Sequence, residues 1–454
     1  MAVPAIVMTE MFDKACRTLV VGLGATGLSV ARYLSGRGVS VAIVDSREQP
    51  PALERSRAEL PADVALFLGG FHKDAFERAE QIVISPGVSM DEPEIAAARA
   101  RQVPVIGDIE LFAQAAAAPV IAVTGSNGKS TVVTLLSAMA RRAGLDVRTG
   151  GNIGTPALDL LAAEEPDLYV LELSSFQLET LHSLQPQAAV VLNISDDHLD
   201  RYRDLQDYAA TKQAVYARAA LQVVNLDDPV AATLADAQRP VAGFTASVPA
   251  ANEYGLLEHA GETWLARGEV RIMPASGVRM AGRHNLVNAL AALALGEAAG
   301  LSLTTMVETL GEFQGLPHRM QYVTEHHGVR WFNDSKGTNV GATLAAIAGV
   351  GGKVVLIAGG DGKGADFAPL AIALQRKGHG AVLIGKDAPL LETVLQDAVP
   401  VRRADDMQQA VQQAAGMAQP GDCVLLSPAC ASTDMYRNFE ARGDAFMQAV
   451  RELR

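Results

Sequence analysis

The segment Thr124-Gly125-Ser126-Asn127-Gly128-Lys129-Ser130-Thr131 decides the fold of this chain. It follows an apolar run at 119–123, which predicts a buried strand, and it precedes a run at 132–136 that predicts the first turns of a helix. A strand, a glycine-rich turn ending in Gly-Lys-Ser and a helix form the layout of a phosphate-binding loop. We expect the loop N–H groups, the helix N-terminus and Lys129 to face phosphate oxygens, and Ser130 or Thr131 to hold Mg²⁺.

The spacing of the two glycines in this loop narrows the choice among nucleotide-binding proteins. Gly125 and Gly128 bracket only two residues, so the loop is shorter than the usual G-x-x-x-x-G-K-S/T pattern. The alternative is a glycine turn that carries a lysine with no role. Because strand, loop and helix agree, the sequence predicts a site for a nucleoside triphosphate.

Composition limits the class of protein. A chain of 454 residues predicts two to three domains, and a net charge of −13 argues against a nucleic-acid binder. The few cysteines fit a reducing cytoplasm. They are Cys16, Cys423 and Cys430. We see no signal-peptide pattern at 1–14 and no apolar stretch long enough to span a membrane, so we expect a cytoplasmic protein.

Apolar runs separated by helical patterns divide the chain into three α/β blocks with predicted limits 1–107, 108–314 and 315–454. Alternating strands and helices predict parallel sheets with ligands at the carboxyl ends of the strands. The predicted strands are 17–21, 39–44, 81–85 and 103–106 in the first block, 119–123, 168–173 and 188–192 in the second, and 353–358, 380–384 and 422–426 in the third.

The first block carries a second glycine motif. Gly22, Gly24 and Gly27 form G-x-G-x-x-G directly after a predicted strand, and Asp45 ends the next predicted strand. Taken alone, this pattern indicates a dinucleotide such as NAD, and an NAD-dependent oxidoreductase is a rival interpretation. A tight turn that only packs a helix on a sheet is another.

Acidic residues at two strand ends are candidate metal ligands. Glu172 follows an apolar run, and a buried carboxylate is costly unless it is paired or binds a cation. The cluster Asp196-Asp197-His198 with Asp200 follows the next predicted strand. The alternative for Glu172 is a carboxylate at an exposed strand end. The alternative for the cluster is a solvated acidic turn.

Two glycine-bearing loops in the third block carry lysines. Lys336 and Thr338 lie in 333–339, and Lys363 lies in 359–363. Each loop follows a strand-like run, so each lysine is placed to bind an anion such as a phosphate or a carboxylate. The alternative for each is a surface lysine in a turn.

Taken together, these segments resemble the Mur ligases of bacterial cell-wall synthesis along essentially the whole chain, in the family's three-domain order. Within that family the chain looks most like the members that add glutamate to UDP-N-acetylmuramoyl-L-alanine. The matching segments are 125–130, 171–177, 196–202, 282–289, 315–319 and 427–432. The resemblance implies a Rossmann-like first domain without redox chemistry, a central ATP-binding domain and a Rossmann-like third domain that binds glutamate.

The resemblance also implies roles for individual residues. Those implied for the UDP moiety are Gly24, Ala25, Thr26, Asp45, Ser46, Arg47 and Gly87, with Asn152 and His198 near the muramoyl-alanine end. Those implied for ATP are Gly125, Ser126, Asn127, Gly128, Lys129, Ser130, Thr131, Asn285, Asn288, Arg319, Asp334 and Lys336. Those implied for glutamate are Thr338, Lys363, Ser432, Thr433 and Phe439.

Two magnesium ions are implied as well. Their implied ligands are Ser130, Thr131, Glu172, His198 and Lys212, the last matching a family lysine that CO₂ converts to a carbamate. Lys129, Glu172, His198 and Lys212 are thus the implied catalytic residues. A lysine on a helix surface is the alternative for Lys212.

The implied reaction activates a carboxylate by phosphoryl transfer from ATP, after which the glutamate amine attacks the acyl phosphate. We expect a monomer whose domains close about hinges near Gly107 and Gly315. Gly337 and Thr433 depart from the alanine and leucine usual in the family, which leaves D- or L-glutamate open. Other rivals are a ligase for another UDP-muramoyl peptide, a folylpolyglutamate synthetase and an ATPase without ligation.

Overall fold

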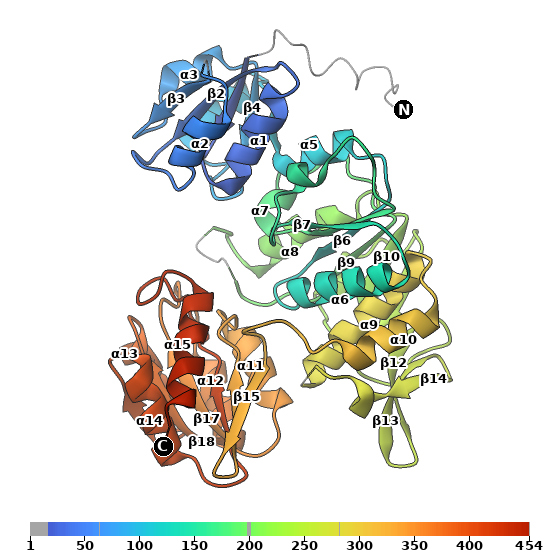
Figure 1. Cartoon of the computed structure of the whole chain (residues 1–454), viewed down its shortest axis with the longest axis vertical. Helices are drawn as coiled ribbons and strands as arrows, with labels where there is room; N and C mark the ends of the chain where they lie inside the picture. The colour runs from blue at the N-terminus through green and yellow to red at the C-terminus, as the bar shows by residue number, and fades with distance from the viewer. Residues whose placement is uncertain (1–16, 63, 198–200, 281, 454) are drawn as a thin grey trace.

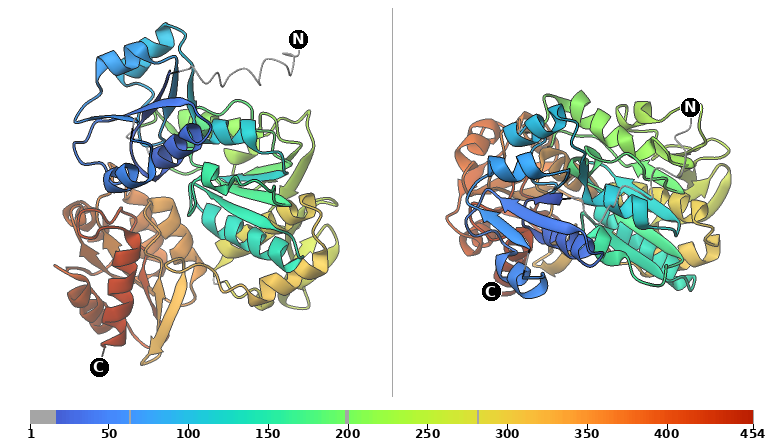
Figure 2. Two further views of the ribbon diagram at one scale, coloured as in Figure 1. Left: turned by 45° about the horizontal axis from the view of Figure 1, so that its top comes forward. Right: turned by 90° about the horizontal axis from the view of Figure 1, so that it is seen from above.

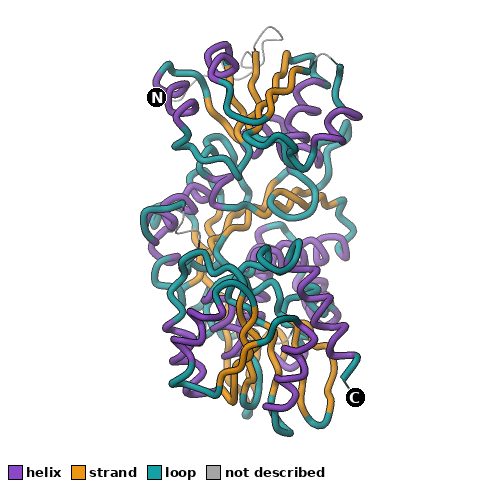
Figure 3. Tube along the Cα trace, turned by 90° about the vertical axis from the view of Figure 1, so that its left-hand side faces the viewer, coloured by secondary structure: helices purple, strands orange, loops and turns teal. Residues whose placement is uncertain are grey.

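A computed structural model describes residues 17–62, 64–197, 201–280 and 282–453. The chain forms three sheets of five, nine and six strands, which follow one another along the sequence. Figure 1 shows them as three lobes, coloured blue, green to yellow, and orange to red. The left-hand view in Figure 2 keeps the lobes distinct, and the tube in Figure 3 shows helices flanking the strands.

The first sheet is parallel throughout, with strand order β3-β2-β1-β4-β5. Its central strands are apolar and buried, as a parallel sheet covered on both faces requires. The elements of this part are β1 (Arg17–Val21), α1 (Ala25–Ser35), β2 (Ser40–Asp45), α2 (Leu53–Glu59), β3 (Ala65–Leu68), α3 (Lys73–Arg78), β4 (Gln81–Ile84), α4 (Pro93–Ala100) and β5 (Val105–Gly107).

The middle sheet has the order β14-β13-β12-β11-β10-β9-β6-β8-β7 and is parallel except for the β12–β14 meander. Its helices and first strands are α5 (Asp108–Ala115), β6 (Val120–Thr124), α6 (Lys129–Arg142), β7 (Val147–Gly151), β8 (Leu168–Glu172), α7 (Ser175–Leu178), β9 (Ala188–Val191) and α8 (Leu205–Gln213). The remaining elements are β10 (Leu221–Asn225), β11 (Val241–Phe244), β12 (Tyr254–His259), β13 (Glu262–Arg267), β14 (Val270–Pro274), α9 (Arg283–Ala298) and α10 (Leu303–Glu312).

The third sheet has the order β15-β16-β20-β17-β18-β19, with only the β15–β16 pair antiparallel. Its elements are β15 (Gln321–His326), β16 (Val329–Asn333), α11 (Val340–Gly349), β17 (Val354–Gly359), α12 (Ala368–Lys377), β18 (Gly378–Ile384), α13 (Ala388–Leu395), β19 (Val401–Arg403), α14 (Met407–Met417), β20 (Cys423–Leu426) and α15 (Phe439–Arg451).

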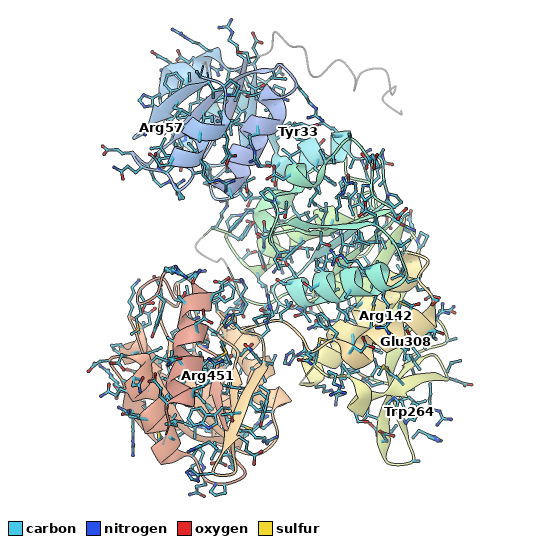
Figure 4. All side chains as sticks on the ribbon, in the orientation of Figure 1. Tyr33, Arg57, Arg142, Trp264, Glu308 and Arg451 are labelled. Carbon is cyan, nitrogen blue, oxygen red and sulfur yellow. The ribbon has the colours of Figure 1, made fainter. Side chains whose placement is uncertain are left out.

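Packing between the helices of the middle part is mainly apolar. α6 and α9 lie against each other and supply a continuous buried cluster that includes Leu135, Leu136 and Leu290. At the far end of α6, Arg142 pairs with Glu308 and Glu312 of α10, and Figure 4 shows Arg142 and Glu308 close together. Within the described part of the chain, no helix combines the length and the apolar character needed to cross a membrane.

Candidate active site

The phosphate-binding loop lies between β6 and α6, as the sequence predicts. Gly125 and Gly128 have φ of 146° and 87°, which favour glycine, and a Cβ at Gly128 would lie 2.5 Å from Asn288 Oδ1. Lys129 Nζ donates to the carbonyl oxygens of Gly125 at 2.6 Å and Ser126 at 2.8 Å. The ammonium therefore lies over the mouth of the loop, where phosphate oxygens would meet it.

A cavity of about 410 Å³ opens beside this loop, between the middle and third parts of the chain. Eight residues predicted to handle ATP line it: Asn127, Gly128, Thr131, Asn285, Asn288, Arg319, Asp334 and Lys336. Gly125, Ser126, Lys129 and Ser130 belong to the adjoining loop but do not line the cavity. Residues more than 150 positions apart in the sequence thus meet around one space.

The same cavity has a second region that the sequence analysis missed. Phe244, Val287 and Ala345 supply apolar surface there, and Asn225 and Asp228 supply polar edges. Asn225 ends β10 and donates to the Leu192 carbonyl at 2.7 Å, which holds the two strand ends together. The polar residues Asn225, Asp227 and Asp228 after an apolar strand were the available signal, because ligands bind at the carboxyl ends of strands in a parallel sheet.

The third part of the chain reaches directly into the phosphate loop. Arg319 donates to Ser130 Oγ at 2.9 Å, and Asn339 Nδ2 donates to Asn127 Oδ1 at 3.2 Å. Burial lowers the pKa of the Arg319 guanidinium, while Glu172 and Asp334 oppose that shift. The contact places a cation from the third part beside a hydroxyl predicted to bind magnesium.

Two further groups around the cavity have pKa values shifted by burial. Desolvation raises the pKa of Asp334 to about 6, against the hydrogen bond that Ser427 Oγ donates to it at 2.7 Å. Desolvation and the charge of Arg319 lower the pKa of Lys336 to about 8. Lys336 Nζ lies 3.9 Å from the ring centroid of Phe439. This cation–π contact ties the nucleotide cavity to a residue predicted to contact glutamate.

The carboxylate of Glu172 has the environment expected of a metal ligand. It is 3 % exposed at the end of β8, and its Oε1 accepts a hydrogen bond from Asn152 Nδ2 at 2.8 Å. Its Oε2 is buried and has no hydrogen-bond partner among the residues that the structure describes. A buried, unsatisfied carboxylate oxygen is costly, so this donor fits a divalent cation.

The other predicted metal ligands are only partly described. His198 lies outside the described residues, as does Asp200. Ser130 and Thr131 begin α6 and are buried. No group of three His, Cys, Asp or Glu side chains with metal-ligand geometry occurs within the described ranges. An oxygen set completed by hydroxyls and phosphates fits magnesium, which binds to proteins through few carboxylates.

Lys212 is deeply buried beneath the phosphate loop. It lies on α8, is 1 % exposed, and its Nζ donates to Thr124 Oγ1 at 3.3 Å. Desolvation lowers the pKa of Lys212 well below the ordinary value, and the charge of Lys129 lowers it further. The charges of Asp197 and Glu172 oppose this shift. The prediction that Lys212 lies near the catalytic groups fits this position, whereas a helix-surface lysine does not.

A second cavity of about 520 Å³ lies between the first and middle parts. Every described residue predicted to hold the UDP-linked substrate lines it: Gly24, Ala25, Thr26, Asp45, Ser46, Arg47, Gly87 and Asn152. Gly22, Phe71, Ser85, Val88 and Gln177 were not predicted and line it as well. Because Asn152 also binds Glu172, this cavity reaches the candidate metal ligand.

The Gly22–Gly27 motif forms a tight turn between β1 and α1. A Cβ at Gly27 would lie 1.8 Å from the Gly22 carbonyl oxygen, so this glycine permits close helix–strand packing. Asp45 accepts hydrogen bonds from Leu23 N at 2.7 Å and from Arg47 Nε and Nη2 at 2.8 and 2.7 Å. Desolvation raises the pKa of Asp45, but these donors outweigh it and the net pKa is lowered. The carboxylate thus orients Arg47 at the cavity wall.

The residues predicted to bind glutamate come from loops at one edge of the third sheet. Thr338, Lys363 and Ser432 follow the carboxyl ends of β16, β17 and β20, which are neighbours in the sheet. Ser432 is buried, whereas Thr433 and Lys363 are exposed. None of these three, nor Thr338 or Phe439, is among the residues that line the 410 Å³ cavity, and the Phe439 ring contacts the lining residue Lys336.

The departure at Gly337 has a local reason. A Cβ there would lie 2.7 Å from both Asp334 Oδ2 and Ser427 Oγ, which are hydrogen-bonded to each other. The structure gives no reason for threonine at 433, which is exposed.

The fold and these cavities define a class: a three-domain α/β enzyme with a glycine-rich loop between a strand and a helix of its middle domain, and with cavities that face both flanking domains. Three family profiles match the chain in order. They are described as Mur ligase MurD-like, N-terminal domain over 16–107, Mur ligase middle domain over 123–296, and Mur ligase, glutamate ligase domain over 318–430.

Relatives agree with these matches. A protein of Nitrosococcus oceani described as UDP-N-acetylmuramoylalanine–D-glutamate ligase is 57 % identical over 97 % of this chain and 97 % of its own length. One of Pseudomonas putida with the same description is 51 % identical over 95 % of this chain and 96 % of its own. The chain belongs to the Mur ligase family.

Solved structures share the fold at low identity. The MurF ligase of Thermotoga maritima in complex with ADP has a TM-score of 0.61 and 16 % identity, covering 91 % of this chain and 95 % of that one. The UDP-N-acetylmuramate–alanine ligase of Thermotoga maritima has a TM-score of 0.59 and 19 % identity, covering 96 % and 99 %.

Proposed function

We propose that this protein joins D-glutamate to the alanyl carboxylate of UDP-N-acetylmuramoyl-L-alanine at the expense of ATP, in peptidoglycan precursor synthesis. The names of the relatives that span nearly the whole chain support this substrate choice. The observation that carries the proposal is the contact of Arg319 with Ser130. It brings the glutamate ligase domain against the phosphate loop, as a reaction between groups bound on different domains requires.

The chemistry follows from the charges around the loop. The γ-phosphoryl group of ATP moves to an oxygen of the alanyl carboxylate, which gives an acyl phosphate and ADP. The neutral amine of glutamate then attacks the acyl carbon, the C–O bond to phosphate breaks, and an amide and inorganic phosphate result. Lys129, Arg319 and Lys336 offset the negative charge that gathers as the phosphates and the carboxylate meet.

The two cavities divide the substrates. We assign the 410 Å³ cavity to ATP, with its phosphates at the loop and its base beside Phe244, Val287 and Ala345. We assign the 520 Å³ cavity to the UDP-linked substrate, whose reactive end points toward Asn152. Asn152 links this cavity to Glu172, since its Nδ2 donates to Glu172 Oε1.

Glu172, Ser130 and Thr131 would hold magnesium, and His198 is assigned to the same task from the resemblance. When bound, the ions supply positive charge that offsets the phosphates during transfer. Asn152 orients Glu172 through the Oε1 contact, which leaves Oε2 directed at the site.

Lys212 is proposed to be a carbamate. A lowered pKa increases the neutral fraction of the amine, and the neutral amine attacks CO₂, forming an N–C bond and releasing one proton. We expect protein prepared with carbon-13 bicarbonate to show a carbamate carbonyl resonance that is missing from Lys212→Arg. Wild-type protein without that resonance at neutral pH would contradict the assignment.

Lys363 is proposed to bind a carboxylate of glutamate. A charge-assisted hydrogen bond of ordinary strength predicts that Lys363→Ala raises the KM for D-glutamate about 10- to 100-fold, with the KM for ATP unchanged. Lys353→Ala is the matched control, because Lys353 is exposed just before β17 and Lys363 follows that strand. Unchanged glutamate dependence in Lys363→Ala would remove this lysine from the site.

The proposed function is tested by phosphate release from ATP and Mg²⁺ with UDP-N-acetylmuramoyl-L-alanine, supplying D-glutamate, L-glutamate or another amino acid singly. We expect release only with D-glutamate. Release with L-glutamate alone would keep the mechanism and change the substrate. ATP-independent activity with NADH would instead favour the oxidoreductase that the Gly22–Asp45 pattern first suggested.

We further propose domain limits of 1–107, 108–314 and 315–454, with closure about Gly107 and Gly315. The profile matches fall inside these limits, and Gly315 has a φ of 90° that favours glycine. A cytoplasmic location and a monomeric state are predictions from the sequence alone.

A further inference from the structure

Arg442 is a buried cation beneath the loops of the third sheet. It lies on α15 and is 1 % exposed. Its guanidinium donates from Nη2 to the Ser335 carbonyl at 2.8 Å and from Nε to Ser335 Oγ at 3.1 Å. Nη1 donates to the carbonyls of Cys430 at 3.1 Å and Gly359 at 3.4 Å.

This cation has no carboxylate partner in an ion pair among the residues that the structure describes. Desolvation lowers its pKa to about 10, so it is charged at neutral pH. Burying a charge without a counter-ion is expensive. The three backbone carbonyls and one hydroxyl that it binds are the visible compensation.

Each acceptor lies in, or at the start of, a loop that carries a residue proposed to bind glutamate. Ser335 precedes Lys336 and Thr338, Gly359 precedes the loop of Lys363, and Cys430 precedes Ser432. Within the described ranges, no other side chain hydrogen-bonds to all three loops.

The loops are also joined directly to one another. Ala429 N donates to the Gly337 carbonyl at 2.9 Å, and Asp361 and Ala431 exchange hydrogen bonds at 3.0 and 2.8 Å. At Gly360 a Cβ would lie 2.1 Å from the Ala431 carbonyl oxygen, so these loops are in close contact. Arg442 therefore lies under three loops that are hydrogen-bonded to one another. A change in the length or charge of the Arg442 side chain would shift all three loops.

We infer that Arg442 is the positioning residue of the amino-acid site: its hydrogen bonds fix in register the three loops that surround a substrate with two carboxylates. The inference rests on the proposed function. Arg442 itself is buried below the loops and acts through Lys336, Lys363 and Ser432.

The test compares Arg442→Met and Arg442→Lys with wild-type enzyme in the complete ligase assay. Arg442→Met keeps the bulk and removes the charge, whereas Arg442→Lys keeps the charge and loses the planar fork that reaches three loops. Arg451→Met is the matched control, since Arg451 is exposed at the end of the same helix and is labelled in Figure 4. The KM values for D-glutamate, ATP and the UDP substrate are measured separately, and ADP affinity is measured by titration.

We expect the KM for D-glutamate to rise about tenfold or more in Arg442→Met, and less in Arg442→Lys, because small displacements of binding groups have large effects. The KM for ATP and the ADP affinity should change less than the KM for D-glutamate, because most of the residues assigned to ATP lie on the middle domain and only Asp334 and Lys336 flank a residue that Arg442 binds. If Arg442→Met does not fold, the comparison of wild type with Arg442→Lys tests the inference, and the KM for D-glutamate should be higher in Arg442→Lys.

Equal changes in all three KM values, or a change in kcat alone, would overturn the inference, because a general structural role lowers the amount of active enzyme without selecting one substrate. Wild-type enzyme without D-glutamate-dependent turnover would overturn the proposed function, and the inference with it.

Discussion

Replacing Lys129 with alanine is expected to lower turnover about a thousandfold, the size of effect seen when a group that stabilises transition-state charge is removed. Lys129 Nζ lies within 2.6 and 2.8 Å of two loop carbonyls, and the loop N–H groups alone do not supply a full positive charge. Phosphate release with saturating substrates gives the measurement.

The control is Arg142→Ala at the other end of the same helix, where two exposed ion pairs contribute little. The Lys129→Ala protein should melt near the wild-type temperature, so its defect would lie in the reaction. Turnover within a few-fold of wild type would refute the assignment of this loop to the phosphates.

The second large effect is expected at Glu172. Glu172→Gln keeps one oxygen that can accept the hydrogen bond from Asn152 Nδ2. It removes the negative charge of the side chain and puts an amide nitrogen in place of the unpaired, buried Oε2. Loss of one carboxylate ligand should lower turnover about 100- to 1,000-fold and weaken Mn²⁺ binding in the presence of ADP. Mn²⁺ binding, followed by electron paramagnetic resonance, separates loss of the metal from loss of the fold.

Glu269→Gln provides the matched carboxylate-to-amide control, because Glu269 is exposed in the turn between β13 and β14. It should bind Mn²⁺ and turn over as wild type does. Wild-type Mn²⁺ affinity in Glu172→Gln would show that this carboxylate serves the fold only.

Local sequence predicted much of the parallel framework. The strand predicted at 17–21 coincides with β1, and the strand predicted at 119–123 lies one residue before β6, because fully buried strands are short apolar runs bounded by glycine and polar residues. The helix predicted from 132 begins three residues earlier, at Lys129. The sites at the carboxyl ends of the strands followed from the same rule.

The antiparallel strands were missed for a physical reason. β12 to β14 mix exposed polar and buried apolar residues, and β15 is only partly buried, so neither forms an apolar run. Their place in the sheet depends on neighbours such as β11 and β16, which sequence patterns do not identify.

Arg442 and the apolar end of the nucleotide cavity were missed because long-range packing creates both. Arg442 lies in an amphipathic helix, where an arginine predicts an exposed position, and only the fold brings Ser335, Gly359 and Cys430 to it. Phe244 and Ala345 likewise meet only when two domains come together. Lys212, by contrast, was predicted from the resemblance to the family. The sequence around it does not indicate that its side chain is buried.

Carboxylate activation by phosphoryl transfer is the central claim, and isotope transfer tests it most directly. UDP-N-acetylmuramoyl-L-alanine labelled with oxygen-18 in the alanyl carboxylate is incubated with the enzyme, ATP, Mg²⁺ and D-glutamate, and the phosphate and product are examined by mass spectrometry. We predict a product heavier by one glutamyl residue and inorganic phosphate that carries one labelled oxygen. Glutamyl product accompanied by unlabelled phosphate would contradict an acyl-phosphate route, and labelled substrate recovered without any glutamyl product would contradict the ligase.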